Sequence, residues 1–397
     1  MKRKHLLTAV LLVIMAATLS GQTRPKRFLT APLTIEDQGS FFVGGVQKIT
    51  DHASVAPPVP GAAPPPLAPH QITIGQMYVQ FEIPARKYGG WPVIMVHGSS
   101  HTAACLESTP DGREGWYPYF VRKGVPSYIV DQSGRGRSGF DESVFNEGNG
   151  PGLARITNDG AWTNWFGHLV PANSTIRTGR LIPHADPADP DPNPDRFQHV
   201  APLFPLEAVD EYYKQLVPNG EATLPGSTCE SCDPKALSPA NTWTPQNLAT
   251  LVEQLGGAVV VTHSQAGIMG HHMARILKER GHLGLLKGLV TLEGSCSLPN
   301  SGLTAADFDN IPYMALKGDY TATSMVCQET VDAINARRAS KQGAAKADYL
   351  KLDEMGILGV THMMMLDRKN LEIADVIYNW IGKNVPAGGS RRSPSTR

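Results

Sequence analysis

The sequence predicts an α/β fold with a doubly wound, mostly parallel sheet. Between about residues 71 and 385, short apolar runs rich in β-branched residues alternate with helical segments of ten to fifteen residues. Strands that are covered by helices on both faces have such continuous apolar runs, and helical crossovers place them in parallel. The chain has 397 residues, of which 41% are hydrophobic and 18% charged, so it can bury a large core.

The pattern gives an order of elements along this region. Residues 72–83 form one or two strands, and the apolar run WPVIMV at 91–96 is a buried strand. The further strands are expected at residues 127–130, 258–261, 286–292, 312–316 and 348–352. The helices are expected at residues 114–123, 244–255, 267–280, 330–338 and 371–381. We find no internal repeat.

The ends of the chain differ from this region. Residues 1–21 resemble a secretory signal peptide, because a basic start (Lys2 to Lys4) precedes an apolar stretch too short for a comfortable membrane span and then small residues. An uncleaved anchor is the alternative. We expect the mature chain to be periplasmic or secreted, without stable membrane insertion. Residues 22–70 form a Pro-rich N-terminal segment with one possible strand at GSFFVGG, and the tail 386–397 is expected to be disordered.

An insertion interrupts the alternation at about residues 140–241, which are rich in Pro, Gly and Asn. We expect this insertion to form a cap over the sheet. Its acidic run ADPADPDPNPD at 185–195 suggests calcium, but proline at alternate positions removes the turns that a ligand loop needs, so a solvated loop is preferred.

Composition and motifs argue against several partners and cofactors. The formal net charge is zero and the pI is near 7.2, which gives no sign of a nucleic-acid partner. The pair His271-His272 has no acidic partner at zinc-site spacing, so no metal is expected. GRGRSG at 134–139 matches a dinucleotide motif, but no helix-forming segment follows it to hold a pyrophosphate. Arg135 and Arg137 are instead expected to tie down loops.

Five cysteines are compatible with disulfides if the chain is exported. Cys229 and Cys232 resemble a redox or zinc pair, but they lie in a Pro/Ser-rich stretch without further ligands, so a local structural disulfide is preferred. Cys296–Cys327 is a plausible second bridge, which leaves Cys105 over.

The residues VVVTHSQAG at 259–267 place one serine between a β-branched strand and a helix-forming segment. Such a turn exposes a serine hydroxyl at the end of a sheet, with a helix N-terminus beneath it to stabilise negative charge. Ser264 is therefore the candidate nucleophile. His263 is expected to support the turn rather than to react.

A serine nucleophile needs a base, and the carboxyl ends of the strands are where reactive groups gather in a doubly wound sheet. His362, in GVTHMMMLD, is the one histidine after residue 282 and is the candidate base. Two acids end strands between the serine and this histidine, Glu293 and Asp319, and strand position alone does not separate them. Either could instead be a helix cap or a solvated turn acid.

Fixed N–H donors must stabilise the charge that develops on a substrate oxygen. The backbone N–H of Gln265 is one candidate by its position after the serine. The loop His97-Gly98-Ser99-Ser100 follows a strand and would supply the other, from Ser99.

These motifs resemble the α/β-hydrolase superfamily: HG at 97–98, DQSGRGRSG at 131–139, THSQAG at 262–267 and the late His362. The resemblance is to a group of exported bacterial carboxylesterases with an HSQ nucleophile elbow and the acid after the strand that follows the nucleophile helix. It implies the triad Ser264, Glu293 and His362, with Asp319 as the second choice of acid and Ser99 and Gln265 as oxyanion donors. The common motif has glycines where this chain has Thr262 and Ala266.

The expected activity is cofactor-free hydrolysis of a small carboxylic ester through an acyl-enzyme. Within the cap, Trp162, Trp165, Phe166 and Phe204 could line the substrate pocket, or they could pack the cap's own core. A lactonase, an amidase and a non-catalytic binding protein on the same scaffold are the alternatives.

Overall fold

A computed structural model describes residues 28–53, 61, 67–141, 155–170, 180–182, 201–219, 243–320 and 327–387. The expected signal peptide, the acidic Pro run at 185–195, the pair Cys229 and Cys232, and most of the tail lie outside these ranges. The described residues form an eight-stranded sheet in the order β1-β2-β4-β3-β7-β8-β9-β10 and a small two-stranded sheet, β5-β6.

The neighbours from β4 through β10 all pair in parallel, whereas β1 and β2 are antiparallel additions at one edge. The sheet is therefore mostly parallel, as the sequence predicts. The strands of the main sheet are β1 (Ile35–Ala53), β2 (Leu67–Pro84), β3 (Val93–Val96), β4 (Ser127–Asp131), β7 (Ala258–His263), β8 (Leu286–Leu292), β9 (Tyr313–Lys317) and β10 (Ala347–Lys351).

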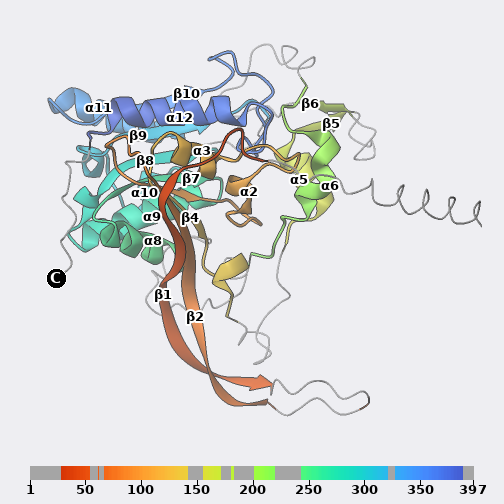
Figure 1. The fold of residues 1–397 in the computed structure, drawn as a ribbon. Helices are drawn as coiled ribbons and strands as arrows, with labels where there is room; N and C mark the ends of the chain where they lie inside the picture. Colours follow the sequence, from red (N-terminus) through yellow and green to blue (C-terminus); the bar gives the residue numbers. More distant parts are fainter. Residues whose placement is uncertain are drawn as a thin grey trace, which may run out of the picture.

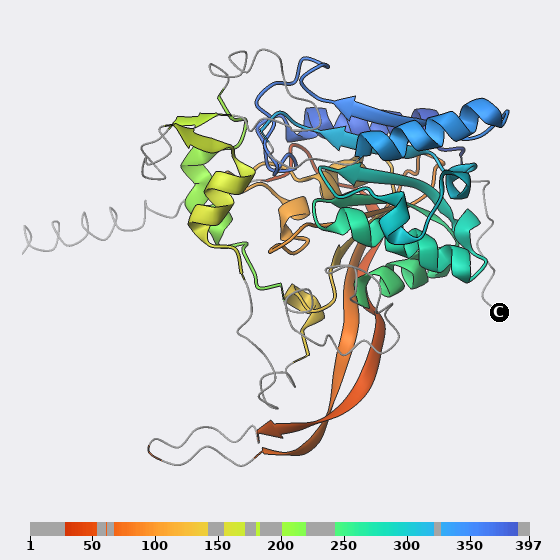
Figure 2. The same ribbon diagram turned by 180° about the vertical axis from the view of Figure 1, so that it is seen from behind.

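Helices cover both faces of the sheet (Figures 1 and 2). They are α2 (Ala104–Glu107), α3 (Trp116–Arg122), α8 (Trp243–Gln254), α9 (Ala266–Glu279), α10 (Leu298–Ser301), α11 (Cys327–Ser340) and α12 (Asn370–Asn384), with short 3₁₀ turns η1 (Gly136–Ser138), η4 (Leu283–Leu285) and η5 (Ala305–Phe308).

The core lies in two layers, because successive side chains of a strand point to opposite faces. In β7, Val259 and Val261 join the cluster that contains residues of α3 and α12. Val260 joins the other cluster, which contains residues of α8, α9 and α11. Continuous apolar strands such as AVVVTH are thus buried on both faces.

The sheet begins earlier in the chain than the expected start at residue 71. β1 and β2 pair over their whole length, from Ile35 opposite Pro84 to Ala53 opposite Leu67, and this long ribbon extends away from the body (Figure 1). Part of the segment 22–70 is therefore sheet. The GSFFVGG stretch, where the sequence predicts one possible strand, lies within β1. Exposed and less exposed side chains alternate along only parts of this strand.

The described parts of the insertion form a separate cluster at one end of the sheet (Figure 1). Its elements are α5 (Asn158–Trp165), β5 (His168–Val170), β6 (Arg180–Ile182), η3 (Leu206–Ala208) and α6 (Val209–Tyr213). Backbone hydrogen bonds join it to the loop before α12: His362 N–H donates to Trp165 O at 3.0 Å, and Leu203 N–H donates to Gly359 O at 2.7 Å. The cluster therefore lies over the end of the sheet where this loop runs.

Candidate active site

Ser264 lies in a sharp turn between β7 and α9. Its φ of 55° is in the left-handed region, which is rare for a residue with a side chain and marks local strain. Two backbone hydrogen bonds hold the turn: Ser264 N–H donates to Leu292 O, and Gly267 N–H donates to Ser264 O, both at 2.9 Å. The serine is partly exposed although β7 beside it is buried. The turn therefore presents the hydroxyl at the carboxyl end of the sheet.

The turn forms although Thr262 and Ala266 stand where glycines are common. Thr262 is fully buried, and its hydroxyl donates to Val290 O at 3.1 Å. Glycines further along α9 instead allow the helix to pack closely against its neighbours. A Cβ on Gly267 would lie 2.7 Å from Ser295 O, and one on Gly270 would lie 2.9 Å from the methyl group of Thr262. Small residues in the helix thus compensate for the larger ones in the turn.

His362 and Glu293 meet at this edge although 69 residues separate them. His362 Nδ1 lies 2.7 Å from Glu293 Oε2, and the other carboxylate oxygen accepts from Gly318 N–H at 2.6 Å. Glu293 is 1% exposed and follows β8 directly with a φ of 44°, a second strained backbone position. A carboxylate accepts hydrogen bonds only, so Nδ1 carries the proton and Nε2 is left as the basic nitrogen.

Burial lowers the pKa of His362 to about 4, so the imidazole is neutral at neutral pH and can accept a proton. Its surroundings also fix its position. The backbone O of His362 accepts from His263 Nε2 at 2.7 Å, so His263 supports the turn and its neighbouring loop. Burial lowers the pKa of His263 well below its ordinary value, which keeps that ring neutral too.

Asp319 has a different partner. Its two carboxylate oxygens accept from the backbone N–H groups of Gly359 at 2.8 Å and Val360 at 2.6 Å. These residues begin the loop that carries His362, so Asp319 holds that loop by its backbone, and Glu293 contacts the imidazole. Burial raises the pKa of Asp319 to about 6.

Ser99 and Gln265, the expected oxyanion donors, lie beside the serine turn. Gln265 directly precedes α9, and Ser99 follows Gly98, where an added Cβ would lie 2.8 Å from Ser264 Cβ. The loop after β3 therefore packs directly on the serine turn. In the described part of the chain, neither the Ser99 nor the Gln265 backbone N–H donates to a protein acceptor. Both are available for a substrate oxygen.

Sequence analysis missed two residues that fix this loop. Asn219, from the insertion, donates to Ser99 Oγ at 2.9 Å and accepts from Ser100 N–H at 2.6 Å. His101 contacts Ser99 O through Nδ1 at 2.7 Å and the Tyr212 hydroxyl through Nε2 at 3.0 Å. No local pattern around these residues predicts the contacts, because their partners are as much as 120 residues away in the chain.

The four cap aromatics divide into two groups. Phe166 and Phe204 are fully buried, with ring centroids 4.1 Å apart, and Trp162 packs edge-on against Phe166. These three pack in the hydrophobic cluster that also contains residues of β7 and α12. Trp165 is partly exposed, and its ring stacks on His362 with 6.2 Å between centroids. Of the four, Trp165 is the one placed beside the candidate base.

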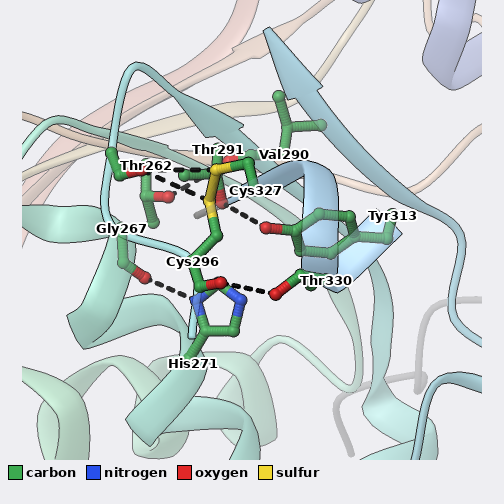
Figure 3. The surroundings of a disulfide bond; sticks show 10 residues. Thr262, Gly267, His271, Val290, Thr291, Cys296, Tyr313, Cys327 and Thr330 are labelled. Carbon is green, nitrogen blue, oxygen red and sulfur yellow. Dashed lines mark hydrogen bonds between the residues drawn. A yellow bond between two sulfur atoms is a disulfide. The ribbon is translucent and has the colours of Figure 1, made fainter. Parts of the chain in front are cut away.

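The disulfide Cys296–Cys327 forms three residues after Glu293 and joins the loop after β8 to the start of α11 (Figure 3). Near it, His271 Nδ1 bonds with Gly267 O at 2.8 Å, and Thr330 donates to the Cys296 carbonyl (Figure 3). Cys105 is a buried free thiol, as expected. The disulfide thus anchors the loop that carries Glu293.

The GRGRSG segment, metal ligands and membrane-spanning helices were also considered in the sequence. GRGRSG forms a loop and the short turn η1 after β4, and Arg137 pairs with the buried Asp131 at 2.8 Å, so this segment ties down loops. Among the described residues, no group of three or more His, Cys, Asp or Glu side chains could hold a metal ion. Within the same ranges, every helix is too short or too polar to span a bilayer.

Comparison with known proteins gives two informative relatives. A fungal protein described as a probable secreted lipase, from Fungal sp. (strain ATCC 74256), is 28% identical over 353 residues, which are 77% of this chain and 86% of that protein. A solved structure described as a novel bacterial esterase has a TM-score of 0.67 and 30% identity, and the match covers 91% of this chain and all of that one. This chain belongs to the α/β-hydrolase esterases. No known family model matches its sequence.

Membership of these esterases makes the protein a carboxylic ester hydrolase. The parallel sheet, the strained serine turn and the helices on both faces are the architecture of an α/β hydrolase.

Proposed function

We propose that this esterase is an exported serine hydrolase with a Ser264-His362-Glu293 triad. The observation that carries the proposal is the 2.7 Å contact between His362 Nδ1 and Glu293 Oε2, at the sheet edge where Ser264 is exposed. This contact leaves Nε2 basic, as a general base requires. Asp319, the second choice of acid, is occupied by two backbone N–H groups.

The reaction has two steps. His362 Nε2 accepts the Ser264 proton as the serine oxygen attacks the ester carbonyl, and Glu293 stabilises the imidazolium that forms. The oxyanion accepts hydrogen bonds from the backbone N–H groups of Ser99 and Gln265. The imidazolium then protonates the leaving alcohol. Water activated by the same nitrogen attacks the acyl-enzyme and releases the acid. No step requires a cofactor.

A carboxylic ester of modest size is the proposed substrate, in keeping with relatives described as an esterase and a lipase. The stacking of Trp165 on His362 supports the proposal that this residue of the cap contacts the substrate. A substrate panel of aryl esters, lactones and anilides would measure the preference for the ester bond, and a lactone or anilide turned over faster than every ester would contradict it.

Replacement of Ser264 by alanine tests the catalytic proposal. We expect S264A to lose turnover of p-nitrophenyl acetate by several orders of magnitude and to lose labelling by a fluorophosphonate probe, since the hydroxyl is the attacking group. The matched control is S340A, which removes an exposed serine hydroxyl at the end of α11. Wild-type turnover by S264A would refute the proposal.

Export is proposed from the signal-like residues 1–21 and is supported by the Cys296–Cys327 disulfide, which suits an oxidising compartment. The relative described as a secreted lipase agrees. Fractionation of expressing cells followed by N-terminal sequencing would test it. A cytoplasmic protein with its first 21 residues intact would contradict it.

A further inference from the structure

Arg135 lies in the loop after β4 with its side chain buried among the residues of the candidate site. The residue is 3% exposed. Its Nη1 donates to Gly98 O at 3.1 Å, and its Nη2 donates to Gln265 Oε1 at 2.5 Å. A planar guanidinium with fixed, forked donors can hold two acceptors at a set separation. Arg135 therefore links the loop after β3 to Gln265, the residue directly before the nucleophile helix α9.

The two acceptors belong to the groups that, under the proposed function, stabilise the oxyanion. The carbonyl of Gly98 and the N–H of Ser99 are in one planar trans peptide, so they point in opposite directions. A hydrogen bond that holds the Gly98 carbonyl toward Arg135 therefore fixes the direction of the Ser99 N–H. The second donor is the backbone N–H of Gln265, whose own side chain Arg135 holds.

His97 completes this arrangement on the same carbonyl. Its Nε2 accepts from Gln132 N–H at 3.0 Å, so Nδ1 carries the proton and donates to Gly98 O at 2.8 Å. The Gly98 carbonyl thus accepts from two side chains, one of them charged. Hydrogen bonds to a peptide carbonyl polarise the peptide and strengthen the N–H of the same unit as a donor.

The charge of Arg135 adds to this effect. Arginine keeps its proton in proteins, so a positive charge lies one peptide away from the Ser99 donor. Because the guanidinium is buried, its charge is less screened than in bulk solvent and attracts a developing oxyanion more strongly. The same charge gives little to a neutral ester in the ground state, so its effect should fall on the transition state.

We propose that Arg135 is a positioning residue of the oxyanion hole, which aims and polarises the Ser99 and Gln265 donors from outside the substrate site. The proposal rests on the proposed function, because it needs those two N–H groups to bind the oxyanion. Arg135 does not touch the substrate and differs in this from a catalytic residue.

The test compares R135M with the matched variant R137M, from the same loop. Arg137 pairs with Asp131 and Gln80 and contacts neither oxyanion residue. We expect R135M to lower kcat by about 10- to 100-fold, somewhat less than removal of a donor itself, with KM changed less than threefold. We expect R137M to retain kcat within threefold of wild type.

A readout beyond turnover separates positioning from general structural support. An aryl boronic acid forms a tetrahedral adduct with the serine and mimics the oxyanion state, whereas the product alcohol does not. We expect R135M to weaken boronate binding by the same factor as kcat and to leave the inhibition constant of the alcohol within threefold. A wild-type kcat, or a reduced kcat with unchanged boronate affinity, would overturn the proposal.

Two further variants keep the test decisive. If R135M does not fold, R135K retains the charge but cannot span both acceptors, and the same comparison of kcat and boronate affinity is applied to it.

Q265A removes the second acceptor while it keeps the N–H. The effects of R135M and Q265A on kcat should therefore be less than additive in the double variant, and full additivity would contradict coupling through Gln265. If S264A keeps its turnover, the proposed function fails; if S264A is inactive and R135M resembles wild type, this inference alone fails.

Discussion

Replacement of Glu293 by glutamine should remove most of the activity while it preserves the shape of the site. The Gly318 N–H, 2.6 Å from Oε1, requires an acceptor there, so the amide oxygen takes that place. The amide NH₂ then faces His362 Nδ1 at the 2.7 Å position of Oε2. An NH₂ group donates, so Nδ1 must give up its proton and the imidazole must carry it on Nε2. In that tautomer His362 cannot accept the serine proton.

The size of the effect follows from this tautomer change. In the Ser-His-Asp systems that serve as a template, the corresponding amide replacement lowers kcat by about 10⁴-fold, or roughly 5.5 kcal/mol at 1.36 kcal/mol per tenfold. We expect E293Q to lower kcat for p-nitrophenyl acetate by about 10³- to 10⁴-fold. The KM should change little, because the carboxylate is buried away from the substrate.

The matched control is D319N, which makes the same chemical change one strand along. One of its two backbone N–H donors would then face an NH₂ group, at a cost of about 1–3 kcal/mol in the free energy of unfolding. The kcat of the folded fraction should stay within about tenfold of wild type. Turnover is followed at 405 nm and stability by urea unfolding. If D319N loses 10³-fold in kcat and E293Q less than tenfold, the assignment of the acid is wrong.

Four other predictions have defined outcomes. The double variant C296S/C327S should lose about 3–4 kcal/mol in the free energy of unfolding, from the 31-residue separation of the two cysteines, and an unchanged urea midpoint would contradict this. G98A should fold but lose at least tenfold in kcat, because its Cβ would lie 2.8 Å from Ser264 Cβ; wild-type kinetics would show that the loops are not in contact. The acid limb of kcat/KM should have its midpoint below pH 6.5, because burial lowers the pKa of His362, and a midpoint above 7 would exclude that. Burial raises the pKa of Asp367 to about 8, so the stability that this residue contributes is complete below pH 4 and is lost as the pH rises toward 8. Thermal unfolding of D367N should therefore show a smaller decrease in stability between pH 4 and pH 8 than wild type. An equal decrease in both proteins would refute this.

The parallel part of the fold was predictable because its signals are local. An apolar run such as WPVIMV or GLVTL must be buried on both faces, and the helices between such runs have their own periodicity. The strands and helices that the sequence predicts between residue 91 and the end of α12 accordingly fall within a few residues of their expected positions, whereas the short helix α2 and the elements of the insertion were not predicted. The edge ribbon was not predicted at its full length, because β1 contains Gly44, Gly45 and exposed side chains such as Ile49, which weaken the strand pattern.

The candidate site likewise contains residues that local sequence signals predict and residues whose roles depend on the tertiary fold. Ser264, Gln265 and Ser99 follow from strand ends, which sequence can locate. The choice between Glu293 and Asp319 depends on where two carboxylates point after neighbouring parallel strands, and this is set by the backbone: Glu293 leaves β8 at a φ of 44°. The roles of Asn219 and Trp165 depend on how the insertion folds back, and no local pattern encodes such contacts.

Glu293 and Asp319 together restrict the movement of the loop that carries His362, the proposed base. Asp319 accepts the N–H groups of residues 359 and 360, and Asp367 accepts the N–H and hydroxyl of Thr361, so three successive residues before His362 are held by buried acidic side chains. Glu293 then has to orient only the ring. A base fixed in this way loses little entropy when the substrate reacts, which is the advantage of a preorganised site. The second acid therefore has a structural reason to be buried even when it does not contact the imidazole.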